Sequence, residues 1–250
     1  MAECTRAFGI DIGGSGIKGA IVDLETGEFV GDRLRIPTPQ PATPDAVAQT
    51  CRELIDHFDL DASMPVGITI PAPVSHGVVL FMANLDPTWK GVNVAELMES
   101  ALGRRVYAVN DADAAGYAEV RYGAAKGRDG VIIVTTLGTG IGSAVIFDGK
   151  LLPNTELGHL EIDGKDAEKS ASSAQKTRHE WSFKQWSKRL QRYYAHLEML
   201  FTPDLFVVGG GVSKKHEKFL PLLDLRTPIV PAQLLNSAGI VGAAALAAQS

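Results

Sequence analysis

Two carboxylates and two glycine-rich turns are the residues of this sequence best suited to phosphate chemistry. Asp11 opens the first turn, "DIGGSGIK" (11–18), whose glycines Gly13, Gly14 and Gly16 can present backbone N–H groups to an anion without a blocking Cβ. A carboxylate beside such a turn is suited to Mg²⁺ held through water, because magnesium keeps part of its hydration shell. The plainer alternative is a tight turn in a twisted sheet.

A second glycine turn repeats the design of the first about 125 residues later. The stretch 130–150 has the order apolar strand, Gly-x-Gly turn and apolar strand, with "LGTGIG" at 137–142. This repeat predicts two domains built on one plan, with both hairpins facing a common cleft. The dinucleotide fingerprint is excluded because the first glycines run into β-branched residues and not into a helix, and no Walker A motif is present.

The second carboxylate, Asp111, follows a predicted strand in "NDADAAGYAE" (110–119). Ligands of α/β proteins often bind where strands end, and phosphoryl transfer needs a base for the attacking hydroxyl. Asp111 is therefore the candidate general base. The alternative is that Asn110 and Asp111 only cap the following helix, since both residue types are favoured there.

Three further polar residues are closely spaced in "NTELGHLEIDG" (154–164), namely Glu156, His159 and Glu161. A Glu–His metal pair lacks further His or Cys ligands nearby, so hydrogen bonding to a polyhydroxyl ligand is the favoured interpretation. A surface loop is the alternative. A third glycine cluster, "LFVVGGGVS" (205–213), is by itself typical of a strand-to-helix turn.

Basic residues gather in one segment, since eight of the 24 lysines and arginines lie between positions 165 and 192. Around 182–201 the spacing predicts a helix whose apolar face carries Trp186, Leu190, Tyr193, Leu197 and Leu200. The opposite face carries Lys184, Lys188, Arg189 and Arg192. These four cations indicate either a track for a linear polyanion or an ordinary solvated helix face. We set RNA aside because the sequence offers no interleaved aromatic and basic platform.

Composition narrows the class of protein. With 45% hydrophobic and 21% charged residues and a net charge of −5, the chain is a globular protein that does not coat nucleic acid with its whole surface. Two cysteines, Cys4 and Cys51, exclude a disulfide scaffold and a multi-cysteine zinc site. No run of eighteen apolar residues and no signal-peptide pattern occur, so we expect a cytoplasmic protein without membrane contact.

The predicted elements are those of an α/β protein. Strands are expected at 7–12, 17–23, 28–36, 66–71 and 105–111, and helices at 45–58, 93–103, 112–125 and 237–249. The expected domains are a smaller one formed by 1–109 with 238–250 and a larger one formed by 110–237. The alanine-rich helix at 237–249 is expected to return to the first domain as a close-packed hinge partner.

Six motifs in order carry a family resemblance: "DIGGSGIK", "NLDPTWKG", "NDADAAGYAE", "LGTGIGSA", "ELGH" and "GGGVS". The sequence resembles the ROK family of sugar kinases, and "GHLEIDGKDAEKSASS" resembles the polyphosphate-dependent glucokinases within it. The resemblance implies the two-domain actin/hexokinase-like ATPase fold (ribonuclease H-like) with a central cleft. It implies transfer of a terminal phosphoryl from polyphosphate or ATP to the 6-hydroxyl of glucose, with Mg²⁺ as cofactor, by a homodimer without a nucleic-acid partner.

Three other functions stay open at this point. One is an ATP-dependent kinase of mannose or an N-acetylhexosamine. Another is a sugar-responsive repressor, which is disfavoured because only eight residues precede Gly9. The last is a filament-forming relative of actin.

The resemblance also implies roles for individual residues. Asp11 would lie beside the metal, and Asp111 would deprotonate the glucose 6-hydroxyl. The phosphate-binding residues would be Gly13, Gly14, Ser15, Lys18, Gly138, Thr139 and Gly140. The sugar-binding residues would be Asn84, Asn110, Glu156, His159 and Glu168, and the adenosine of ATP would face Gly209, Gly210 and Gly211. Many family members carry a cysteine-rich zinc motif after "GH"; this chain has none, so no zinc is expected and the alignment of Glu168 is the least secure.

Overall fold

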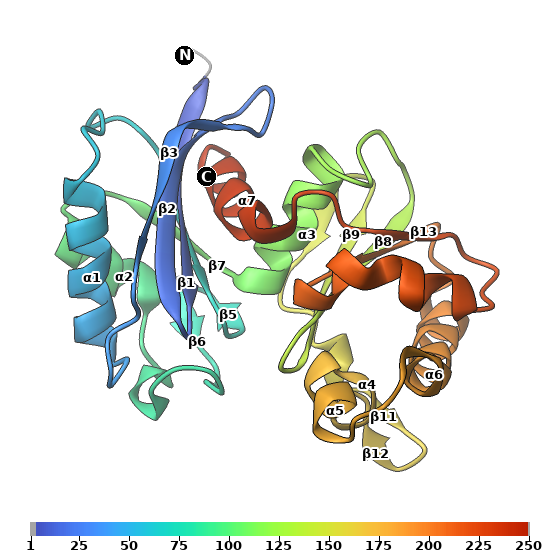
Figure 1. The fold of residues 1–250 in the computed structure, drawn as a ribbon. Helices are drawn as coiled ribbons and strands as arrows, with labels where there is room; N and C mark the ends of the chain where they lie inside the picture. The colour runs from blue at the N-terminus through green and yellow to red at the C-terminus, as the bar shows by residue number, and fades with distance from the viewer. Residues whose placement is uncertain (1–3, 250) are drawn as a thin grey trace. The chain divides into compact units, whose positions relative to one another are not determined.

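The computed structural model describes residues 4–249, so residues 1–3 and 250 of the predicted domain limits lie outside it. The chain divides into two compact units, Met1–Ala118 with Ser237–Ser250 and Glu119–Asn236. Figure 1 shows the elements of both units along the chain. The division falls at 118/119, nine residues after the 109/110 boundary expected from the sequence, because most of helix α3 packs with the first unit.

The first unit is built on a five-stranded sheet of order β3-β2-β1-β4-β7. Its strands are β1 (Arg6–Gly13), β2 (Gly16–Asp23), β3 (Phe29–Ile36), β4 (Val66–Ile70) and β7 (Val106–Asn110). The first three are antiparallel neighbours, whereas β1, β4 and β7 run parallel. All five expected strands are therefore present. A small hairpin, β5 (Val74–Ser75) and β6 (Val78–Val79), follows β4.

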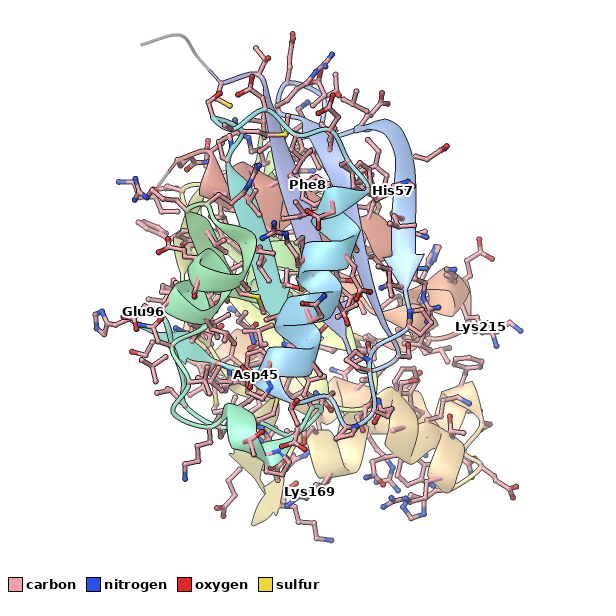
Figure 2. The ribbon with its side chains drawn as sticks, turned by 90° about the vertical axis from the view of Figure 1, so that its left-hand side faces the viewer. Phe8, Asp45, His57, Glu96, Lys169 and Lys215 are labelled. Carbon is pink, nitrogen blue, oxygen red and sulfur yellow. The ribbon has the colours of Figure 1, made fainter. Side chains whose placement is uncertain are left out.

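Two helices cover one face of this sheet, α1 (Pro44–Asp56) and α2 (Val94–Leu102). The expected start of α1 is confirmed, since Thr43 caps it and Pro44 occupies its first turn. Figure 2 views α1 from outside, with Asp45 and His57 at its two ends and Phe8 of β1 near the second. Gly103 ends α2 in the left-handed conformation that glycine adopts at little cost. The short helix η1 (Pro87–Trp89) precedes α2.

Helix α7 (Ala238–Ala247) packs against β1 and β4 on the other face of the sheet. At Gly9 a Cβ would lie 2.0 Å from the carbonyl oxygen of Ile240, and at Gly67 it would lie 1.9 Å from that of Ala243. The C-terminal helix thus returns to the first unit, as expected. On α7 itself, a Cβ at Gly242 would lie 1.8 Å from the backbone oxygen of Ala114 in α3 (Asp111–Arg121), which explains why the first part of α3 belongs to this unit.

The second unit repeats the first, with a sheet of order β10-β9-β8-β13-β14. Its strands are β8 (Val131–Leu137), β9 (Ile141–Phe147), β10 (Lys150–Leu152), β13 (Leu205–Gly209) and β14 (Ile229–Pro231). Again the first three are antiparallel and β8, β13 and β14 are parallel. The prediction of two domains on one plan is confirmed at the level of topology.

Helix α6 (Phe183–Phe201) packs on one face of this second sheet through Trp186, Leu190, Tyr193, Tyr194 and Leu197. Leu200, expected on the same face, is instead 51% exposed, whereas the next residue, Phe201, is partly buried and packs against the core. The remaining elements are η2 (Leu157–His159), β11 (Glu161–Ile162), β12 (Lys165–Asp166), α4 (Glu168–Ala171), α5 (Ser173–Arg178), η3 (Gly211–Lys218), η4 (Leu220–Leu222) and η5 (Leu235–Ser237).

Glu119, the first residue of the second unit, is a buried carboxylate with backbone partners at both ends of that unit. It accepts hydrogen bonds from the N–H groups of Ala124 (2.8 Å), Gln233 (3.1 Å) and Leu234 (2.7 Å). The carboxylate therefore joins the beginning of this unit to the segment just before its end.

Across residues 4–249, we find no helix with the length and apolar character needed to cross a membrane.

Candidate active site

Asp11 lies near the end of β1, where strand pairing brings two partners to its carboxylate. Lys18 is opposite it on antiparallel β2 and Thr69 beside it on parallel β4. Lys18 Nζ lies 2.9 Å from Oδ2, and the Thr69 hydroxyl donates to Oδ1 at 2.9 Å. Each carboxylate oxygen has more than one acceptor site, and Mg²⁺ prefers such oxygens, so Asp11 fits a cation held through water.

The first glycine turn links β1 to β2 and is held from outside by side chains of β3 and the segment after it. Arg35 donates to the carbonyl oxygen of Ser15 at 2.6 Å, and the Thr38 hydroxyl donates to that of Gly13. A Cβ at Gly14 would lie 3.3 Å from the backbone oxygen of Asn84. The structure therefore brings Asn84 to this turn. Sequence reasoning missed Arg35, whose guanidinium adds positive charge here.

Asn110 and Asp111 stand where β7 passes into α3. The Asn110 side-chain oxygen accepts from the N–H groups of Ala112 (2.9 Å) and Asp113 (3.1 Å), so Asn110 does cap the helix. Its side-chain NH₂ is the group suited to donating to a sugar hydroxyl.

The candidate base lies at the same edge of the sheet as Asp11. The pairs Asp11–Thr69 and Ile70–Asn110 put β1 and β7 two strands apart, roughly 10 Å at the usual strand spacing. The Asp111 carboxylate is partly buried and lies 2.8 Å from the N–H of the next residue. One sheet edge of the first unit thus carries the first glycine turn, the Asp11 carboxylate and the candidate base.

In the second unit, the second glycine turn contacts Glu168 directly. Glu168 Oε2 accepts from the N–H of Ile141 at 3.2 Å, and a Cβ at Gly140 would lie 2.3 Å from the same oxygen. The turn closes on itself through the N–H of Gly138 and the carbonyl oxygen of Gly140 at 3.0 Å. Thr139 is exposed at its tip. The structure therefore unites this turn with Glu168, a predicted sugar residue.

The other predicted sugar residues of this unit gather around Glu168. His159 Nδ1 lies 2.9 Å from Asp166 Oδ2, and the N–H of Glu168 donates to Asp166 Oδ1 at 3.0 Å. Glu161, in contrast, is exposed on β11. Sequence reasoning missed Asp166 as a site residue.

The charges of this cluster shift one another's pKa values. Burial raises the pKa of Glu156, the charge of His159 lowers it, and that of Glu168 raises it, with a net upward shift. The hydrogen bond to Asp166 is the largest influence that raises the pKa of His159, with the negative charges of Glu168, Asp166 and Glu156 adding to it against partial burial. Partial burial alone would raise the pKa of Asp166, but the His159 hydrogen bond and two backbone N–H groups lower it overall.

His159, Asp166 and Glu168 each offer a ligand atom, all within 4.8 Å of one another. The two hydrogen bonds on Asp166 account for this spacing without an ion. The cluster is therefore read as a hydrogen-bonding site, and the expectation of no zinc stays a prediction.

The third glycine cluster lies beside the second glycine turn. Gly210 has a φ of 83°, and a Cβ there would lie 2.4 Å from the backbone oxygen of Leu137, the residue just before that turn. Glycine is required at this position for both reasons. A Cβ added at Gly211 would meet no atom within 4 Å, whereas Gly209 ends β13. The adenosine role of these glycines is not tested by this geometry.

Helix α6 begins at a capping box in which Ser182 and Gln185 satisfy each other's backbone N–H groups. Lys184, Lys188 and Arg189 are exposed on it. Arg192 is also exposed but forms an ion pair with Asp163.

Aromatic and basic side chains contact one another around α6, although the sequence pattern predicts no platform for RNA. The Arg189 guanidinium lies 3.7 Å from the centre of the Trp181 ring, which also stacks with His179 at 4.7 Å. Lys176 and Lys218 lie over the ring of Phe183, at 4.5 and 5.8 Å. Except for Lys218, these residues lie within 176–189, and their contacts depend on how α5 and the start of α6 fold, which the sequence spacing did not reveal.

Residues 7–177 match the ROK family, and the chain belongs to that family. Its fold is the actin/hexokinase-like fold predicted from the sequence. The polyphosphate glucokinase of Mycobacterium tuberculosis (strain H37Rv) is 53% identical over 240 residues, covering 96% of this chain and 90% of the relative.

Two solved structures are similar to this chain over nearly its full length. The inorganic polyphosphate/ATP-glucomannokinase of Arthrobacter sp. strain KM has 54% identity and a TM-score of 0.91, covering 98% of both chains. A ROK family glucokinase from Streptomyces griseus, solved with glucose and AMPPNP, has 27% identity and a TM-score of 0.80, covering 98% of this chain and 100% of that one.

Proposed function

We propose that this protein is a glucokinase that transfers the terminal phosphoryl group of inorganic polyphosphate, or of ATP, to the 6-hydroxyl of glucose. The observation that carries the proposal is one sheet edge with the Asp11–Lys18 pair, the first glycine turn and Asp111. The 53% identity to a polyphosphate glucokinase over most of both chains supports the same donor and acceptor.

In this reaction Asp111 accepts the proton of the glucose 6-hydroxyl as the oxygen–phosphorus bond forms. The bond between that phosphorus and the donor's bridging oxygen breaks, and its electron pair stays on the shortened polyphosphate or on ADP. Backbone N–H groups of the two glycine turns and the Lys18 ammonium stabilise charge on the transferred group. Mg²⁺, when bound at Asp11 through water, would neutralise further phosphate charge.

The acceptor and donor are held by different sets of residues in this proposal. The sugar hydroxyls bond to Asn84, Asn110, Glu156, His159 and Glu168. Gly209, Gly210 and Gly211 face the adenosine when ATP is the donor. The exposed cations of α6 bind the polyphosphate chain. Lys184 and Lys188 contribute more to this binding than Arg192, because Arg192 already pairs with Asp163.

Three expectations complete the proposal. The enzyme works in the cytoplasm, as the sequence pattern predicts, and as a homodimer, as the family resemblance implies. The two predicted domains close on glucose about α7, so that water is excluded as a competing acceptor. Mannose is a second acceptor in this proposal, because the similar Arthrobacter enzyme is a glucomannokinase.

The proposal is tested by measuring glucose 6-phosphate with a coupled assay, using ATP and polyphosphates of several lengths as donors. Product from polyphosphate is expected, and no product from either donor would refute the function. Asp111→Ala should lower kcat at least about 100-fold while glucose still binds, because a general base contributes about 10²–10⁴-fold.

The exposed Asp129 provides a matched control, and Asp129→Ala should leave the rate unchanged. An Asp111→Ala enzyme that retains more than about a hundredth of the parent rate would remove Asp111 from the role of base.

A further inference from the structure

Asp166 connects the two segments that carry His159 and Glu168. It lies on β12, directly opposite Glu161 of β11, in a hairpin whose turn residues Asp163 and Gly164 have φ values of 55° and 71°. This hairpin brings the chain back beside His159 within seven residues. The Asp166 side chain is bonded to both segments.

The two oxygens of Asp166 have different partners. Oδ2 bonds to His159 Nδ1 at 2.9 Å, and Oδ1 accepts from the backbone N–H groups of Glu168 (3.0 Å) and Lys169 (3.4 Å). The second set of bonds lies at the start of α4, whose first residue is Glu168. One side chain therefore fixes a ring orientation and a helix start at once.

The chemistry of the first bond determines what the imidazole presents to a ligand. An ionised carboxylate can only accept hydrogen bonds, so the proton of a neutral His159 must be on Nδ1. The other ring nitrogen, Nε2, then has a lone pair and accepts a hydrogen bond, as a sugar hydroxyl would donate.

We propose that Asp166 is a positioning residue of the sugar site, which holds His159 in the Nδ1–H form so that Nε2 accepts a hydrogen bond from a sugar hydroxyl. The inference rests on the proposed function for the identity of the ligand. The bond that orients the imidazole, in contrast, lies within the second unit. The charged groups that face His159 are Asp166, Glu156 and Glu168.

Asp166→Asn is the informative substitution, because the amide keeps an oxygen for the backbone N–H groups of α4. Its NH₂ donates to Nδ1, which moves the imidazole proton to Nε2 and turns an acceptor into a donor. We expect the KM for glucose to rise about tenfold, as one hydrogen bond in the site is lost, while kcat at saturating glucose changes less than about threefold.

The tautomer is read directly from long-range ¹H–¹⁵N spectra of the full chain labelled at histidine, without ligand. The parent protein should show His159 protonated at Nδ1 and the Asp166→Asn protein should show it protonated at Nε2. An Nε2–H form in the parent protein would overturn the inference even if the variant failed to fold.

Asp163→Asn is the matched control, since Asp163 lies in the same hairpin and its side chain pairs with Arg192. It should change neither the tautomer nor the KM for glucose. A drop in melting temperature in Asp166→Asn with an unchanged KM would reduce Asp166 to a purely structural role and overturn the inference.

Failure of the inference and failure of the proposed function give different results. Normal glucose phosphorylation with an unchanged tautomer in Asp166→Asn would overturn the inference alone. If Asp166→Asn reverses the tautomer but the parent protein phosphorylates no hexose, the proposed function is overturned, and with it the assignment of the ligand.

Discussion

The polyphosphate track on α6 is tested by removing Lys184 and Lys188 together as alanines. Both side chains are exposed, and they are four residues apart on one face of the helix. Neither takes part in the ion pairs found among residues 4–249. The double substitution therefore removes two positive charges without breaking a described salt bridge.

The size of the effect follows from the exposure of the two ammonium groups. Exposed ion pairs contribute up to about 1 kcal/mol each, so losing two should raise the KM for polyphosphate roughly 5- to 30-fold. Each phosphate contact also contributes about 0.7 to the slope of log affinity against log salt for a flexible polyanion, so the slope should fall by about 1.4. ATP is too short to follow the helix, and its KM should change less than about threefold.

The assay measures initial rates with long-chain polyphosphate and with ATP, at saturating glucose and at several salt concentrations. Arg192→Ala serves as the internal comparison, since the pairing with Asp163 leaves it less able to bind a phosphate. Equal losses with both donors, or an unchanged salt slope, would refute the track. A larger loss from Arg192→Ala than from the double substitution would refute the ranking of the cations.

Three other predictions concern the stability of the two units and are read from thermal melting. Glu119→Gln should lower the free energy of unfolding by about 3 kcal/mol and the melting temperature by about 6–12 °C, because three backbone N–H groups lose a buried carboxylate as their acceptor. The control Glu53→Gln, at an exposed position of α1, should leave the melting temperature unchanged. Gly242→Ala should lower the free energy of unfolding by about 1–3 kcal/mol, because the added Cβ forces α7 away from α3. Gly211→Ala places its Cβ in open space and should leave the stability unchanged. The raised pKa of His159 means that its bond to Asp166 adds stability below about pH 6.5, which is lost as the pH rises through the folded-state pKa. The difference in melting temperature between the parent and Asp166→Asn proteins should therefore be larger at about pH 5.5 than at about pH 8.5.

The sheet strands and the main helices could be predicted from the sequence because their signals are local. Apolar runs on both sides of a Gly-x-Gly turn define β1 with β2 and β8 with β9. The start of α1 follows from Thr43 and Pro44, and the end of α2 from Gly103. The shared topology of the two units was also predictable, since the repeat is visible in the sequence.

The site was predicted in part, because its contacts depend on register and on long-range pairing. The bond between Asp11 and Thr69 joins residues 58 positions apart and follows from β1 lying beside β4. Arg35 reaches the first glycine turn only because β3 pairs with β2. Asp166 was not predicted because an aspartate within a basic segment is most simply interpreted as a compensating charge. Only the hairpin of β11 and β12 brings it within hydrogen-bonding distance of His159.

The hydrogen bonds of the Glu119 side chain indicate where the two units can be separated by protein engineering. The chain leaves the first unit once and returns once, so residues 119–236 are an insertion that begins in the last turn of α3 and ends just before α7. Because Glu119 holds the N–H groups of Gln233 and Leu234, the two ends of the insertion emerge side by side. Excising it and joining its flanks with a short linker would keep α7 in register with the first sheet, and the excised piece has neighbouring termini suited to circular permutation.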